Sequence, residues 1–263
     1  MALLSDYNMI NPKERGIAMF SQEPHCVYEK NQLFEVICQL RFPEILSIET
    51  ELPAQFQEAI RDIFPIYSCV KEGQPGKQTN LYQFATADKI WRVNLTSKFI
   101  ALACRRYTNW EAFAGMLDKP LAAFIRIYQP AFFERIGLRY LNFFSRNALH
   151  LQGVPFKELI APAYLGVLAL EDIQENATIR ATVDADTALR GGCRLKLHAG
   201  PGNVKMNTQP DPEVKFILDM DLYMPGRVAV NLSAGALQTL HGQSYPIFRG
   251  AITDRLHEAM EPN

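Results

Sequence analysis

The sequence has no uncharged apolar run that approaches the roughly 18 residues of a membrane-spanning helix. Residues 1–16 also lack a basic segment followed by an apolar segment, which is the pattern of a secretory leader. We therefore expect no membrane association and a cytoplasmic location.

Cysteine pairs are missing as well. The five cysteines are an odd number, are widely spaced and form no Cys-x-x-Cys motif; they are Cys26, Cys38, Cys69, Cys104 and Cys193. This distribution is typical of free thiols in a reducing compartment. The five histidines likewise lack a partner at metal-ligand spacing, and the adjacent His25 and Cys26 do not easily chelate a tetrahedral ion alone.

The chain also lacks an excess of one charge. Its 27 Lys and Arg residues against 28 Asp and Glu residues leave a formal net charge of −1 at pH 7. Basic and aromatic residues are interleaved at Arg105-Arg106-Tyr107, but a nearly neutral chain argues against nucleic acid as a partner. With 48% hydrophobic and 21% charged residues, the composition is that of a globular protein and excludes disordered, collagen-like and coiled-coil chains.

Common catalytic signatures are absent. There is no Gly-x-Ser-x-Gly elbow, no Walker loop, no Gly-x-Gly-x-x-Gly after a strand pattern and no His-Glu-x-x-His. We therefore expect no metal and no cofactor.

What the chain does contain is a regular succession of strand and helix patterns. Residues 1–31 are polar and interrupted by prolines, which indicates an irregular N-terminal arm. The patterns that follow predict a strand at 33–42, a short helix at 52–64, strands at 66–71, 81–86, 90–95 and 99–104, and a long helix from about 108 to 128. Thr108 and Glu111 have the spacing of a capping box at the start of this helix, and Pro120 predicts a kink inside it. Apolar residues step by three and four along one stripe of the helix, which we expect to be buried: Trp110, Phe113, Leu117, Leu121, Phe124 and Tyr128.

A similar succession follows. Patterns predict a strand at 136–144, an irregular helix at 156–170, strands at 178–183, 193–198, 214–223 and 227–232, and a helical tract from 233 to 260 with a break near 242–246. Residues 32–263 are therefore interpreted as one α+β unit, divisible into two pseudo-repeated halves, 32–130 and 131–263.

Short turns between the strands predict an antiparallel sheet covered on one side by long helices. The tandem order of strand, helix, four strands and helix is that of TATA-binding-protein-like domains, whereas a helix-grip sheet around one long helix gives nearly the same order. In either case one sheet face is left for a ligand, a partner chain or solvent.

Several short motifs occur in a fixed order along this unit. They are Phe64-Pro65, Tyr107-x-x-Trp110-x-x-Phe113, Arg139-Tyr140-x-Asn142, Phe216-x-x-Asp219-x-Asp221, and Leu240-His241 followed by Phe248-x-x-x-Ile252-Thr253-Asp254. In this order the chain resembles an uncharacterised, sporadically distributed bacterial family of roughly 250-residue proteins. The resemblance implies a single unit and supplies no activity, substrate or cofactor.

Asp219 and Asp221 are the sharpest polar feature, because residues two apart on a strand project from the same face. This face is either solvated and salt-bridged, or a binding site, or a site for a hard cation. Arg139 needs a carboxylate partner if it is buried, and Asp219 or Asp221 is the candidate. Such an ion pair would tie the two halves together; alternatively, Arg139 binds an anion.

Asn142 and His241 complete the candidate ligand-binding set, which is Arg139, Asn142, Asp219, Asp221 and His241. Asn142 is three residues from Arg139, so the two side chains point to opposite faces of a regular strand. His241 lies beside Leu240 at the edge of an apolar helix face, where most histidines are hydrogen-bonded neighbours of the core.

These features favour a non-enzymatic binding or interaction protein that uses the open sheet face, with a protein or a small molecule as partner. The alternative is a hydrolase-like small-molecule enzyme with a carboxylate or divalent-cation site at Asp219 and Asp221. The strand at 99–104 is apolar on both alternating sets of residues and must be covered on both faces. We therefore also predict a homodimer that buries either Ile100, Leu102 and Cys104 or Phe99, Ala101 and Ala103.

Overall fold

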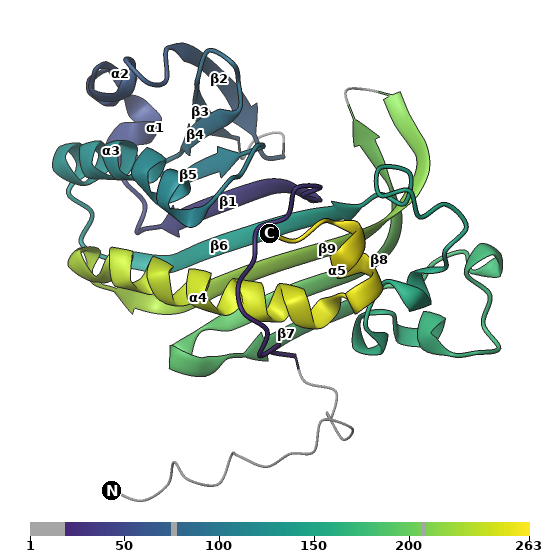
Figure 1. Ribbon diagram of the computed structural model, residues 1–263. Helices are drawn as coiled ribbons and strands as arrows, with labels where there is room; N and C mark the ends of the chain where they lie inside the picture. The colour runs from purple at the N-terminus through teal and green to yellow at the C-terminus, as the bar shows by residue number, and fades with distance from the viewer. Residues whose placement is uncertain (1–18, 75–77, 207–208) are drawn as a thin grey trace, which may run out of the picture.

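The computed structural model describes residues 19–74, 78–206 and 209–263. Over these residues the chain forms a nine-stranded sheet in which every pair of neighbouring strands is antiparallel (Figure 1). This confirms the predicted α+β class with an antiparallel sheet. Within the described ranges no helix is both long enough and apolar enough to cross a bilayer.

Residues 32–130 form the elements β1 (Leu33–Arg41), α1 (Leu46–Thr50), α2 (Ala54–Ile60), β2 (Ile66–Glu72), β3 (Thr79–Ala85), β4 (Trp91–Leu95), β5 (Phe99–Cys104) and α3 (Trp110–Tyr128). The predicted start of α3 is wrong by one residue. Its N-cap is Asn109, whose side chain accepts a 2.8 Å hydrogen bond from the Ala112 N–H. This cap orients Trp110 and Glu111, the first two residues of the helix, at the edge of the pocket described below.

Residues 131–263 form β6 (Phe133–Phe144), β7 (Val183–Ala188), β8 (Arg194–Met206), β9 (Gln209–Val228), α4 (Ser233–Ala251) and α5 (Asp254–Ala259). The predicted strand at 227–232 is wrong: its first residues end β9, and a 3₁₀ turn at Val230–Leu232 follows. The irregular helix predicted at 156–170 is a series of 3₁₀ turns, because Pro162 and the left-handed Gly166 (φ 55°) interrupt it.

The predicted break in α4 does not occur. The helix runs through Gly242 and Pro246 and packs on β6 and β9. Leu240 and Ile247, on either side of these breakers, are fully buried. Burial of this apolar face therefore outweighs the local cost of a proline in the helix.

The strand order is β2-β3-β4-β5-β1-β6-β9-β8-β7, so β1 and β6 lie together at the middle of the sheet. The strands of residues 32–130 extend from β1 to one edge, and those of residues 131–263 extend from β6 to the other. One contiguous cluster of buried apolar side chains includes residues of both halves.

Alternation along the strands gives the sheet two different faces. Helices α3 and α4 lie over the same face, where α3 packs on β5 and α4 packs on β6 and β9 (Figure 1). The other face, which we call the open face, is not covered by a helix of the described residues (Figure 1). The two faces position two different groups of polar residues.

The N-terminal arm is described from residue 19; the predicted arm at 1–31 otherwise lies outside the described residues. It has no regular secondary structure but is tied down by backbone hydrogen bonds. Ser21 N–H donates to the Pro246 carbonyl of α4, and Glu29 N–H donates to the Glu261 carbonyl near the C-terminus. The arm therefore crosses α4 near Pro246 and passes beside the end of the chain (Figure 1).

Candidate functional site

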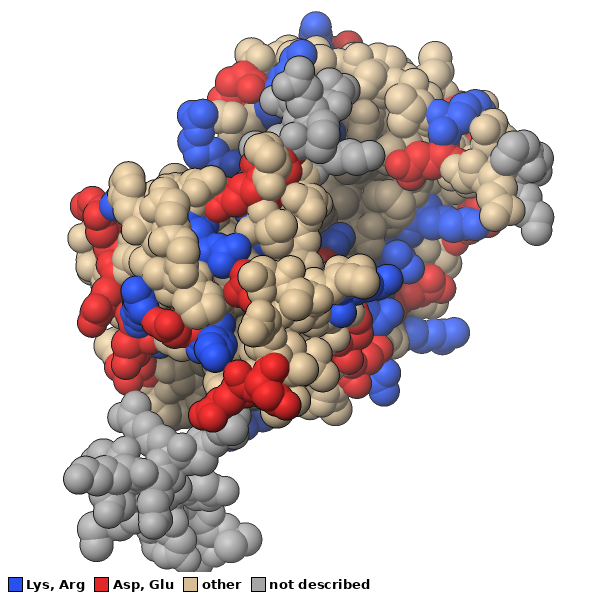
Figure 2. All heavy atoms as spheres, turned by 90° about the vertical axis from the view of Figure 1, so that its right-hand side faces the viewer, with Lys and Arg blue, Asp and Glu red and all other residues tan. Residues whose placement is uncertain are grey.

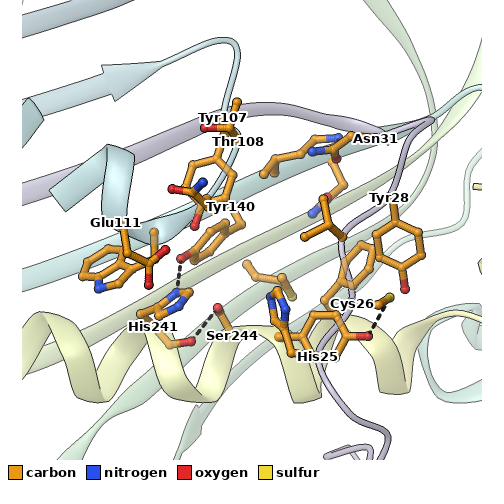
Figure 3. Close-up of a pocket in the computed structure, with 18 residues that line it drawn as sticks. His25, Cys26, Tyr28, Asn31, Tyr107, Thr108, Glu111, Tyr140, His241 and Ser244 are labelled. Carbon is orange, nitrogen blue, oxygen red and sulfur yellow. Dashed lines mark hydrogen bonds between the residues drawn. The ribbon is translucent and has the colours of Figure 1, made fainter. Parts of the chain in front are cut away.

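A cavity of about 430 Å³ lies on the helix-covered face, between the start of α3, the middle of α4 and the arm (Figure 3). Its floor is formed by β6 and β9, with Tyr140, Asn142 and Met220. We call this cavity the inter-helix pocket. It lies where the two halves of the chain meet, so both contribute to its walls.

Trp110 joins the two helices at one end of the inter-helix pocket. Its indole ring stacks on the His241 ring with centroids 4.6 Å apart and an interplanar angle of 8°. The indole N–H donates a 2.8 Å hydrogen bond to Gln238 Oε1, on α4. Trp110 was expected in the buried stripe of its helix, but it is only partly buried because this ring forms a pocket wall.

Tyr140 and His241 form the central polar pair of the inter-helix pocket. The Tyr140 hydroxyl lies 3.1 Å from His241 Nδ1 (Figure 3). Burial raises the pKa of Tyr140 well above its usual range, so the phenol keeps its proton. Burial also lowers the pKa of His241, assisted by the charge of His25 and opposed by Glu111. A neutral His241 with its proton on Nε2 can accept at Nδ1 from the Tyr140 hydroxyl, whereas the other tautomer would donate from Nδ1.

Residues of the arm form the opposite end of the inter-helix pocket. The Tyr28 hydroxyl lies 2.8 Å from His257 Nδ1, on α5, and Cys26 Sγ lies 3.2 Å from the Tyr245 hydroxyl. Burial lowers the pKa of His257, which favours a neutral imidazole beside the Tyr28 phenol. Contacts with α4 and α5 thus hold this wall in place.

The inter-helix pocket has no nucleophile paired with a base among the described residues. Ser244 Oγ donates a 2.7 Å hydrogen bond to the His241 carbonyl of its own helix. The Cys26 thiol contacts a tyrosine hydroxyl, and His241 Nδ1 is already bonded to Tyr140. The geometry is that of a binding cavity whose polar groups are held in fixed positions.

The structure separates the five residues predicted as a site into two groups. Asn142 and His241 line the inter-helix pocket, and Asn142 is 3% exposed with its side-chain amide donating to the Leu218 carbonyl at 3.2 Å. Arg139, Asp219 and Asp221 lie on the open face, where they line a shallow depression of about 570 Å³. The five residues therefore do not form one site.

Arg139 and Asp219 form a bidentate ion pair, in which Arg139 Nε donates to Asp219 Oδ1 at 2.7 Å and Nη2 donates to Oδ2. The hydrogen bonds that Arg139 donates to Asp219 raise the pKa of Arg139. Asp221 is paired in the same way with Arg135, whose Nη2 lies 2.7 Å from both carboxylate oxygens. Both pairs join β6 to β9 within residues 131–263, so the prediction that Arg139 ties the two halves together is wrong.

The open face continues this pattern of paired charges. In β7 and β8, Asp184 contacts His198 Nδ1 at 2.7 Å, and the His198 contact lowers the pKa of Asp184. Among the described residues, no group of three or more His, Cys, Asp and Glu side chains is placed to hold a metal ion. On the side of the molecule seen in Figure 2, acidic and basic side chains are also intermingled.

The apolar strand β5 is covered on both faces by its own chain. Ile100, Leu102 and Cys104 belong to the core beneath the helices. On the open face Ala101 and Ala103 are each 3% exposed, because longer side chains of β1 and β4 stand directly beside them in the sheet. The homodimer stays a prediction, but covering β5 does not require one.

Sequence reasoning missed the aromatic walls of the inter-helix pocket. Tyr107, Trp110 and Tyr140 were noted in short motifs, and Trp110 also in the apolar stripe of its helix. His25 was weighed only as a metal ligand, and Tyr28 was not considered. The available signal was the dense succession of aromatic residues at 107–113, which was assigned to the core stripe.

No protein-family model matches this chain, and no curated protein matches it in sequence. The resemblance to a bacterial family therefore stays a prediction. The function has to be argued from the geometry of the inter-helix pocket and of the open face.

Proposed function

We propose that the protein binds a small organic molecule in the inter-helix pocket and does not transform it chemically. One observation carries this proposal: a cavity of about 430 Å³ has six aromatic side chains in its lining and a few converging polar groups. Small-molecule sites typically have volumes of about 300 to 1,000 Å³ and this composition. The polar groups that fix a ligand's orientation would be the His241 imidazole, the Asn142 amide and the Tyr107 hydroxyl.

The open face is the second candidate, as a surface for a protein partner. Its support is the depression that brings Arg139, Asp219 and Asp221 together with Lys196, which has no ion-pair partner among the described residues. A hydrolase-like or cation site at the two aspartates is less well supported. Each carboxylate already accepts hydrogen bonds from an arginine, and a cation would have to displace that arginine.

We also propose that the fold is a tandem pair of halves, 32–130 and 131–263, arranged as in TATA-binding-protein-like domains. The strand order supports this, because β6, β9, β8 and β7 follow the same sequence from the middle of the sheet as β1, β5, β4 and β3. Each half also ends its strands with a 19-residue helix, α3 or α4, where a helix-grip fold would have one. A cytoplasmic location is part of the proposal, and five unpaired cysteines support it.

Binding of a neutral aromatic probe tests the proposed site. N-phenyl-1-naphthylamine becomes more fluorescent in an apolar cavity, and we expect it to bind the full chain with a stoichiometry of about one. Thr108→Trp places a large side chain at an exposed position on the pocket wall and should abolish the signal. Ala234→Trp, at an exposed position of α4 outside the pocket, is the matched control. Equal binding of the probe by the two variants would show that it binds outside the pocket and would contradict the proposal.

A further inference from the structure

The walls of the inter-helix pocket are rich in aromatic rings and contain few ionisable groups. Six of the lining residues are aromatic, namely Tyr28, Tyr107, Trp110, Tyr140, Tyr245 and Phe248. The lining contains one carboxylate, Glu111, no lysine or arginine, and two imidazoles, His25 and His241. The imidazole of His241 is neutral in this setting because burial lowers its pKa. The cavity therefore combines aromatic rings with one carboxylate and the imidazole of His25.

Glu111 is free to act on a ligand. It has no hydrogen-bond or ion-pair partner among the described residues, and it is an exposed residue in the first turn of α3. It lies near His241 (Figure 3), whose ring stacks on Trp110. Its charge reaches the pocket: besides the effect of burial, Glu111 contributes to raising the pKa of Tyr107 and opposes the lowering at His241. A carboxylate without a protein partner at the edge of an aromatic cavity attracts a cation.

From this arrangement we infer that the ligand of the inter-helix pocket is an organic ammonium cation, held against the aromatic rings and neutralised by Glu111. The inference rests on the proposed function, because it names the chemical class that the same pocket binds. A cation over the face of an aromatic ring gains attraction from the ring quadrupole, and this gain grows when water is excluded. An anionic ligand would meet the carboxylate of Glu111, and the described lining offers it neither lysine nor arginine, only the His25 imidazole.

Two ligands of nearly the same shape distinguish the effect of the ligand's charge on binding from the effect of its size. Choline carries a quaternary ammonium, whereas 3,3-dimethylbutan-1-ol has a neutral tert-butyl group in its place. We expect choline to displace N-phenyl-1-naphthylamine from the full chain at a concentration at least about fivefold lower than the alcohol, as a cation–π contribution of ordinary size requires.

The role of Glu111 is tested by Glu111→Gln, which removes the charge and keeps the size of the side chain. We expect choline to bind about fivefold or more weakly to this variant and the alcohol to bind unchanged. Asp118→Asn removes a carboxylate from an exposed position of the same helix outside the pocket and should leave both ligands unaffected.

Equal displacement by choline and the alcohol, or unchanged choline binding by Glu111→Gln, would overturn the inference. The proposed function would stand in that case, provided that the aromatic probe binds the wild-type chain and is blocked by Thr108→Trp. Failure of the aromatic probe itself to bind would instead contradict the proposed function.

Discussion

Replacing Tyr140 by Phe tests the central hydrogen bond of the inter-helix pocket. The substitution removes the hydroxyl that lies 3.1 Å from His241 Nδ1 and keeps a ring that is only 6% exposed. A neutral hydrogen bond contributes about 1 kcal/mol net, and its removal leaves an imidazole nitrogen unpaired in a half-buried site. We therefore expect the free energy of unfolding to fall by about 1 kcal/mol in urea melts at pH 7.5.

The same substitution should change the titration of His241. We expect the Tyr140 hydroxyl to donate to His241 Nδ1, which would stabilise the neutral imidazole because only the neutral ring can accept at Nδ1. Its loss should raise the pKa of His241, which burial holds below its ordinary value. NMR titration of the imidazole carbon-bound protons measures this directly. An unchanged or lower pKa in Tyr140→Phe would refute the assignment of donor and acceptor.

Tyr164→Phe provides the matched control. Tyr164 is 4% exposed, like Tyr140 nearly fully buried, but its hydroxyl has no hydrogen-bond partner among the described residues. Burying an unpaired hydroxyl costs desolvation free energy on folding, and the variant avoids this cost. We therefore expect Tyr164→Phe to leave the free energy of unfolding unchanged or to increase it. The reasoning fails if Tyr164→Phe is the more destabilising of the two variants.

Three further expectations follow from the same structure. Burial keeps the pKa of His241 below 6.5 in the folded chain, so the unfolded chain takes up the proton first as the pH falls. The contribution of His241 to the free energy of unfolding should be full above about pH 6.5 and decline below it. In urea melts at several pH values, His241→Gln should reduce that decline. Gly200→Ala should destabilise by about 1–3 kcal/mol because its new Cβ would lie 2.5 Å from a backbone carbonyl, whereas Gly202→Ala meets only the mobile end of a side chain and should cost less; similar losses would contradict this difference. Arg139→Ala should cost only about 0.5–1 kcal/mol, since Arg139 is 43% exposed, and millimolar Mg²⁺ should not raise the wild-type melting temperature; a clear rise would revive a cation site at Asp219.

Much of the fold could be predicted from local pattern. The alternation of apolar residues located the strands of residues 32–130, and the stepping by three and four residues located α3. One prediction failed because of a tertiary effect. Helix α4 continues through Gly242 and Pro246 because its apolar face is buried on the sheet. Local propensity is weak compared with burial of a whole helix face.

The candidate site was predictable only in part. The alternation of a strand correctly implied that Arg139 and Asn142 face opposite sides, and that Asp219 and Asp221 share a side, because this depends on backbone geometry alone. A pair of Arg139 with Asp219 or Asp221 followed from the cost of leaving such a charge without a partner, and the structure shows Asp219 as the partner. These are properties of single strands and of single side chains.

The inter-helix pocket was decided by the tertiary structure. Its walls come from the arm, the start of α3, the floor strands β6 and β9, and the middle of α4, which meet only because β1 pairs with β6 and the arm is bound to the C-terminal segment. Trp110 stacks on His241 although more than a hundred residues separate them in the chain. Local patterns record how each element hydrogen-bonds and which face it buries, whereas the order in which strands pair depends on contacts between distant segments.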